Sequence, residues 1–397
     1  MYIQFKGAQQ LRQRIANSLL SGKLIRISDI RSNDSEPGLR DYEASYLRLI
    51  EKVTNGSRID INVTGTTIKF KPGVITGGSG LSHECGTTRS IGYFIEGLLL
   101  FLPFGKAPTQ ITFRGITNDE SALSVDTLRT VTLPFARKFG IEGRDGEALA
   151  LKVVRRGAPP RGGGQVVFDC PIVKKLQCVQ MTELGRVRRV RGVAYTTKVS
   201  PQVANRIVDA TKGVLTRFLP DVYIYTDHYK GVDSGLSPGY GLSLVAETTS
   251  GVTICTEGTA QSKRRGGDKK EEQDTQGLDE VLGVDLASLA REDAKTERPI
   301  MPEEIGQQVA HDLLREVRSQ APIDQSHTAL AIFLMAVAPQ NSSKIRVAPP
   351  SQQTIQLLRD IKEFYGTTFR ITSDDNDTSV LLSCFGAGIA NVVKGIN

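Results

Sequence analysis

The stretch at residues 156–166 reads RGAPPRGGGQV and lies between two apolar segments with a β-type pattern, Leu149–Val154 and Val166–Phe168. Three consecutive glycines after Pro-Pro predict a sharply turning loop, because glycine adopts positive φ and lets backbones approach closely. Arg155, Arg156 and Arg161 flank the glycines. Two interpretations are open: the loop binds a phosphate of RNA or of a nucleotide through N–H and guanidinium groups, or it is a tight connector with solvated arginines.

The spacing of this stretch resembles the signature of the RNA 3'-terminal phosphate cyclase family: Arg-Gly, two residues, Pro, one residue, three glycines, one residue and Val. Ile27–Arg31 and Pro37–Leu39 are similar to that family's N-terminal strand and the loop that follows it. Within the family, the chain most resembles the eukaryotic non-cyclase branch, which acts in small-subunit ribosome assembly. The resemblance implies the cyclase fold with its inserted domain.

Composition sets outer limits on the class of protein. The 397 residues, 39% of them hydrophobic and 23% charged, suffice for two domains with a sizeable core. The net charge of +7 favours a polyanionic surrounding such as RNA. No apolar run has membrane-spanning length, and residues 1–6 lack the pattern of a secretory leader, so we expect an intracellular protein without a membrane partner. The five cysteines, none in a CxxC pair, predict reduced thiols.

Three segments show one order of predicted elements, namely helix, strand, helix and two further strands. We therefore predict an α+β fold with α/β-type repeats, in which three units of two helices and a small sheet form a large domain, residues 1–184 and 305–397. The predicted elements are Gln9–Leu20, Leu24–Ile30, Leu39–Thr54, Arg58–Val63 and Thr66–Lys71; Ile91–Leu102, Gln110–Arg114, Ala122–Phe139, Leu149–Val154 and Gln165–Phe168; and Leu330–Val337, Lys344–Val347, Gln352–Tyr365, Thr368–Thr372 and Ser379–Cys384.

A smaller α/β domain is predicted between the second and third units, over residues 185–304. Its predicted elements are Val187–Thr197, Pro201–Phe218, Val222–Tyr225 and Gly241–Glu247. Residues 261–298 carry clustered charges and few aromatic residues, which predicts a disordered loop.

The resemblance also indicates that the cyclase reaction is lost. The family's adenylylated histidine falls on Ser326 in this chain, and His327 stands one residue late. One residue turns a helical side chain by about 100°, away from the position for in-line transfer. Ala8 stands in the family's glycine run, and Asp41-Tyr42 replaces a Gln-His pair. No zinc-ligand spacing, P-loop or nucleophile elbow is present, and we predict no metal and no cofactor.

Basic and glycine positions are the candidates for anion or RNA binding. They are Arg31, Arg40, Arg156, Arg161, Gly162, Gly163, Gly164, Arg186 and Arg188. Arg186 and Arg188 share one face of the predicted strand, while Arg189 and Arg191 share the other. A solvated basic strand is the open alternative for this cluster.

A second candidate is the segment Arg359-Asp360-Ile361-Lys362, within the predicted helix Gln352–Tyr365. Leu357, Leu358, Ile361 and Tyr365 fit an apolar face, which predicts Arg359, Asp360 and Lys362 near the exposed side. In the non-cyclase branch, the matching segment is associated with binding a ribosome-biogenesis GTPase and with a proposed pre-rRNA cleavage. Asp360 alone, without metal partners or a histidine base, supplies few of the groups that phosphodiester hydrolysis requires.

These observations lead to one hypothesis and two alternatives. The hypothesis is a non-catalytic ribosome-assembly factor of the small-subunit processome, in the nucleus and nucleolus. It would bind a ribosome-biogenesis GTPase, pre-ribosomal RNA and processome proteins, and serve pre-rRNA processing and 18S rRNA maturation. The first alternative is a pre-rRNA endonuclease that uses Asp360, Arg359 and Lys362. The second is an ATP-dependent RNA 3'-phosphate cyclase that uses His327.

Overall fold

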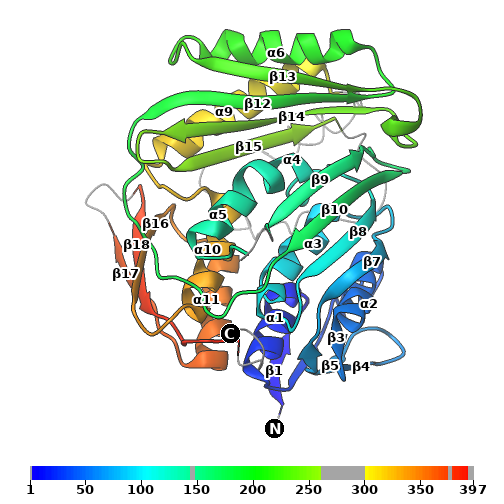
Figure 1. Cartoon of the computed structure of the whole chain (residues 1–397), viewed down its shortest axis with the longest axis vertical. Helices are drawn as coiled ribbons and strands as arrows, with labels where there is room; N and C mark the ends of the chain where they lie inside the picture. The colour runs from blue at the N-terminus through cyan, green and yellow to red at the C-terminus, as the bar shows by residue number, and fades with distance from the viewer. Residues whose placement is uncertain (1, 144–147, 261–299, 374–377, 392–397) are drawn as a thin grey trace, which may run out of the picture.

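The apolar periodicities of the sequence form helices and sheets together, as expected for a mixed α and β protein (Figure 1). The structure is a computed structural model and describes residues 2–143, 148–260, 300–373 and 378–391. The predicted charged loop, residues 261–298, lies outside the described residues. No helix in the described ranges is long and apolar enough to cross a membrane.

Three four-stranded sheets share one order of pairing. Each starts with a parallel pair and continues with two antiparallel pairings. In the first two sheets a helix connects the parallel strands, whereas in the third the fourth sheet and its helices lie between them in the sequence. The sheets are β1 (Ile3–Lys6), β2 (Ile25–Ser28), β5 (Ile68–Lys71) and β4 (Arg58–Ile61); β7 (Gly78–Glu84), β8 (Thr109–Gly115), β10 (Gly164–Cys170) and β9 (Ala150–Arg155); and β11 (Gln180–Met181), β16 (Ser342–Val347), β18 (Val380–Phe385) and β17 (Arg370–Ser373). A two-stranded sheet joins β3 (Thr54–Asn55) and β6 (Val74–Ile75).

The helices of these units gather between the sheets. They are α1 (Leu11–Ser21), α2 (Asp41–Val53), α3 (Ile91–Leu99), α10 (Gln325–Val337) and α11 (Gln352–Tyr365), with a short 3-10 turn at Leu102–Phe104. The helix predicted at Ala122–Phe139 is divided into α4 (Val125–Thr127), the π-helical segment η2 (Leu128–Thr132) and α5 (Leu133–Lys138). Pro134 has no N–H to donate, and the regular bonding gives way just before it.

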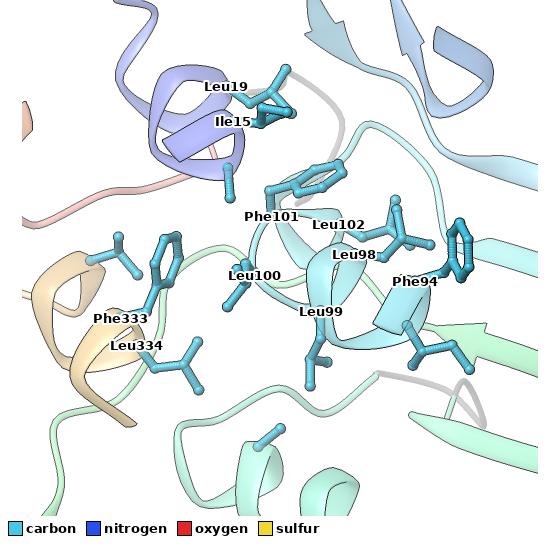
Figure 2. Packing of buried hydrophobic residues seen from close by; sticks show 14 of the residues in the cluster. Ile15, Leu19, Phe94, Leu98, Leu99, Leu100, Phe101, Leu102, Phe333 and Leu334 are labelled. Carbon is cyan, nitrogen blue, oxygen red and sulfur yellow. The ribbon is translucent and has the colours of Figure 1, made fainter. Parts of the chain in front are cut away.

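The main core lies where helices from different units meet. In Figure 1 the first two sheets lie on one side of these helices and the third sheet on the other. Figure 2 shows Ile15 of α1 beside Phe101 and Phe333 of α10 beside Leu100, both in the apolar run Leu98–Leu102 that starts at the end of α3. These side chains are buried and belong to one continuous cluster. Burial of this surface is the main stabilisation of the large domain.

A fourth sheet lies at the other end of the molecule, with the order β13 (Val222–Tyr229), β12 (Val187–Thr197), β14 (Gly239–Thr248) and β15 (Thr253–Thr259). Helices α6 (Pro201–Leu215) and α9 (Pro302–Arg318) cover one face and share a core with it, separate from the main core. A 3-10 turn, η3 (Gly231–Ser234), follows β13. Helix α9 thus packs with the insert, although most of it lies beyond residue 304; the domain boundaries themselves stay a prediction.

Candidate functional site

A groove with a volume of about 390 Å³ opens among the first turns of α1, α10 and α11 and the N-terminal part of α2. Its lining is mostly polar and comes from segments that are far apart in the sequence. The lining residues are Ala8, Gln9, Gln10, Leu11, Arg12, Gln13, Arg31, Tyr42, Glu43, Tyr93, Gln325, Ser326, Ala329, Ser351, Gln353 and Thr354. The groove therefore collects several positions at which the sequence departs from the cyclase pattern.

Two arginines in the groove wall bind carboxylates of the protein itself. Arg31 donates to both carboxylate oxygens of Glu43 at 2.7 and 2.8 Å, and Glu43 also accepts from the Arg40 N–H, which begins α2. Arg12 donates to Glu96 at 2.7 Å and stacks over Tyr93. Arg31, a predicted anion-binding residue, thus lies at the groove and is held in place by Glu43.

Helix α10 presents Ser326 to the groove and turns His327 into the interior. His327 is 2% exposed, its Nδ1 lies 2.7 Å from Asp324 Oδ1, and its Nε2 lies 2.8 Å from Thr132 Oγ1. Burial acts to lower the pKa of His327, but the Asp324 carboxylate outweighs burial and raises it. The reciprocal effect holds the pKa of Asp324 below its usual range. His327 is therefore a structural ion-pair partner in this arrangement.

The glycine loop, residues 156–166, is packed between the second sheet and the insert. Arg156 is 1% exposed and donates two 2.7 Å bonds to Asp126 and bonds of 2.7 and 3.0 Å to Asp227. Burial acts to raise the pKa of Asp126, but Arg156 outweighs it and the pKa is lowered. Buried Asp126 and half-buried Asp227 thus occupy guanidinium donors of Arg156, so the structure lends no support to the prediction that it binds an external anion.

The three glycines are required by close contacts within the protein. Gly162 and Gly163 have φ of 66° and 83°, and a Cβ on Gly163 would stand 2.8 Å from the Leu236 side chain. A Cβ on Gly164 would stand 2.7 Å from Thr117. The Leu236 N–H donates to the Gly162 carbonyl at 2.9 Å. This packing favours the connector interpretation of the loop, in which backbone contacts take the place of a bound phosphate.

Further polar contacts attach the insert to the large domain. Glu257 of β15 accepts from the Ser124 N–H at 2.9 Å and from Thr127 Oγ1 at 2.6 Å. The Cys255 N–H donates to Asp324 Oδ2 at 3.2 Å. The Cys255 thiol, Asp324 and His327 lie within 4.8 Å of one another, a spacing that also suits a metal ion. Because they already bond one another, we assign no metal to them.

Helix α11 separates the three candidate residues Arg359, Asp360 and Lys362. Arg359 and Lys362 are exposed, whereas Asp360 is 2% exposed. Asp360 accepts from Arg14 Nε at 2.7 Å and from Gln356 Nε2 at 2.7 Å. The prediction that Asp360 lies near the exposed side is wrong, because it neutralises Arg14 of α1 inside the protein.

The remaining candidates lie at the surface and apart from one another. Arg40 pairs with Asp34 and Glu36 beside the N-terminus of α2. Arg161 is exposed at the tip of the glycine loop, and Arg186 and Arg188 are exposed at the start of β12. The structure does not bring these arginines together into one site, and their role in anion binding stays a prediction.

Fold and groove together define a mixed α and β protein with a polar groove that contains Ser326, while His327 is turned into the interior. The sequence matches the model of the family described as RNA 3'-terminal phosphate cyclase over residues 3–371. The chain belongs to this family.

Curated relatives match the chain along nearly its whole length. A probable RNA 3'-terminal phosphate cyclase-like protein of Dictyostelium discoideum is 47% identical over 392 residues, 99% of each chain. The RNA 3'-terminal phosphate cyclase-like protein of Homo sapiens is 43% identical, over 99% of this chain and 97% of the relative. The rRNA processing protein rcl1 of Schizosaccharomyces pombe is 36% identical, over 99% and 98%.

Proposed function

We propose that this protein is a non-catalytic assembly factor of the small-subunit processome, which acts in the nucleolus in pre-rRNA processing and 18S rRNA maturation. Two relatives are named cyclase-like rather than cyclase, and a third is named an rRNA processing protein. The single observation that carries the proposal is Ser326 at the groove, with His327 buried against Asp324. Adenylylation needs a nucleophile that faces the bound nucleotide, and a serine without an adjacent base is a weak one.

Two measurements test the absence of catalysis. Purified protein incubated with labelled ATP and an RNA 3'-phosphate is expected to retain no AMP and to form no 2',3'-cyclic end. In cells depleted of the endogenous protein, Ser326→Ala is expected to restore pre-rRNA processing as well as the unchanged chain. A covalent adenylate that disappears in a folded His327→Gln variant, or failed rescue by a normally abundant Ser326→Ala, would refute the proposal.

We place the GTPase-binding surface on α11, at the exposed residues Arg359 and Lys362. Charge reversal by Arg359→Glu is expected to weaken binding to the GTPase about thirtyfold or more, as the loss of an interfacial charge pair typically does. Arg318→Glu is the control, since Arg318 is also an exposed helical arginine and lies on α9, away from α11. Equal affinities of the two variants in a titration with the purified GTPase would place the interface elsewhere.

The endonuclease alternative has less support. Its carboxylate, Asp360, is enclosed, and its two oxygens accept hydrogen bonds from Arg14 and Gln356. An RNA phosphate could reach Asp360 only after this ion pair opened. The expected result with isolated pre-rRNA fragments is no cleavage by the purified chain, whereas a defined cut by a preparation free of contaminating nuclease would restore the alternative.

A further inference from the structure

The two faces of the insert sheet have different surroundings. Val190 and Ile224 point to the face covered by α6 and α9, where they belong to the core of the insert. Side chains alternate along a strand, so Tyr223 and Tyr225, on either side of Ile224, point to the opposite face. Each tyrosine is paired with a residue of β12, Tyr223 with Arg191 and Tyr225 with Val193.

The large domain covers only part of this opposite face. On β14 and β15, Val245 and Cys255 pack against Val131 of the π-helical segment. At the β13 edge the face is open, and Tyr223 and Tyr225 are 53% and 56% exposed. Their ring centroids lie 4.6 Å apart at an interplanar angle of 68°. An exposed aromatic pair on a rigid sheet edge is a feature that a monomer does not need for its own stability.

Arginines gather at the end of the sheet where β13 begins: the pKa of Asp221, two residues before Tyr223, is lowered by Arg191 and also by Arg189 and Arg188, where the pairing of β12 with β14 is irregular. Arg189 pairs with Glu247, and Arg191 pairs with Asp221. Arg186 and Arg188, at the start of β12, are exposed and form no ion pair with any described residue. Of these four arginines, two thus have a carboxylate partner among the described residues and two do not. A protein partner that buried this surface would have to desolvate these charges, whereas RNA phosphates would bind them from solution.

We propose that Tyr223 and Tyr225 form a stacking platform for unpaired bases of single-stranded RNA, with Arg188 binding an adjacent phosphate. Aromatic side chains on an open sheet face, bordered by arginines, are the chemistry that such RNA requires. The platform rests on the proposed function in so far as pre-ribosomal RNA is its physiological ligand. The platform adds two points to the proposed function: where the RNA binds on the protein, and that the bound RNA is single-stranded.

The test uses the full chain and a fluorescein-labelled 12-nucleotide oligouridine, with binding followed by anisotropy at several salt concentrations. Loss of one stacked base typically lowers affinity at least about fivefold, so Tyr223→Ala/Tyr225→Ala is expected to lose tenfold or more. Tyr223→Phe/Tyr225→Phe keeps the rings and is expected to bind within about twofold of the unchanged chain. Arg188→Ala is expected to reduce the salt dependence by about one phosphate contact.

A matched control separates the platform from general effects. Phe385 on β18 is 69% exposed and distant from the insert, and Phe385→Ala is expected to leave RNA affinity unchanged. The platform is overturned if the unchanged chain binds no RNA, if the double alanine variant binds within twofold of it, or if the double phenylalanine variant loses as much as the alanine variant. A loss of GTPase binding alone would assign this surface to a protein partner and overturn it as well.

Cellular rescue distinguishes this proposal from the proposed function. If the unchanged chain binds RNA through the tyrosines but fails to restore pre-rRNA processing in depleted cells, the proposed function is wrong and the platform stands. If it restores processing and the tyrosine variants bind RNA normally in vitro, the platform is wrong and the proposed function stands.

Discussion

The buried ion pair between Arg14 and Asp360 predicts that Asp360→Asn damages the fold before it affects any chemistry. The side chains of the pair are 3% and 2% exposed, and Arg14 also donates to the carbonyls of Lys6 and Gly7 and stacks over Phe5. Asparagine keeps the size and one hydrogen bond but leaves the guanidinium without a counter-charge. Breaking one side of a buried pair typically costs about 3–5 kcal/mol.

The effect of the lost charge can be separated from the change in shape by a variant that lacks both members of the pair. Arg14→Met/Asp360→Leu removes both charges, and replacing a whole buried pair by apolar groups is often close to neutral. We therefore expect the double variant to be more stable than Asp360→Asn alone, by about 2 kcal/mol or more. This order of stabilities is a signature of an uncompensated buried charge, because steric damage would accumulate in the double variant.

Urea unfolding followed by circular dichroism measures the free energies of unfolding. Arg359→Asn, one residue earlier and exposed, is the matched control and is expected to stay within about 0.5 kcal/mol of the unchanged chain. An Asp360→Asn variant as stable as this control would refute the reasoning. The result also decides how Asp360 variants are used in cleavage assays, since lost activity in a partly unfolded protein says nothing about a nuclease.

Four further predictions concern stability and reactivity. Gly163→Val is expected to lower the free energy of unfolding by at least about 2 kcal/mol, measured by urea unfolding, because φ is 83° and Leu236 lies in the path of the side chain. The pKa of His327 is raised, so its stabilisation is full below pH of about 6.5 and is lost as pH rises through the folded pKa; unfolding curves of His327→Gln should lack this decline. Burial, aided by Lys52, lowers the pKa of His83 to about 4, so stability is expected to fall from about pH 6.5 toward 4, and a flat profile would contradict this. Iodoacetamide on the native protein should label Cys178 first, as peptide mapping would show, because the other four thiols are buried.

The elements with strong periodicity could be predicted from the sequence, and those without it could not. Helix α11 has the predicted bounds Gln352–Tyr365, since its apolar stripe is regular and Gly366 ends it in the left-handed conformation. Strand β7 was not predicted, because Gly78–Glu84 contains glycines, serines and a histidine and shows little apolar alternation. It forms because β8 supplies a parallel partner, which is information that no local window contains.

Charged residues at the candidate sites were harder to place than apolar ones. The spacing in α11 does contain a signal for Asp360, which lies three residues after Leu357 and four before Phe364 on the buried face. Arg156 gave no such signal, since its partners lie 30 and 71 residues away in the sequence. The resemblance singled out Ser326, which the structure places at the groove, whereas the open face at Tyr223 depends on how the insert packs on the large domain.

The contact between Arg14 and Asp360 spans 346 residues, and this separation has a consequence for synthesis on the translating ribosome. Helix α1 emerges early, yet its arginine has no counter-charge until nearly the whole chain has been made. The contact between the first and last units therefore forms only late in synthesis. The large domain cannot finish folding in the order in which it is translated. Until α11 arrives, the side of α1 that carries Arg14 stays exposed to chaperones, and chains truncated before residue 360 are expected to be cleared rather than assembled.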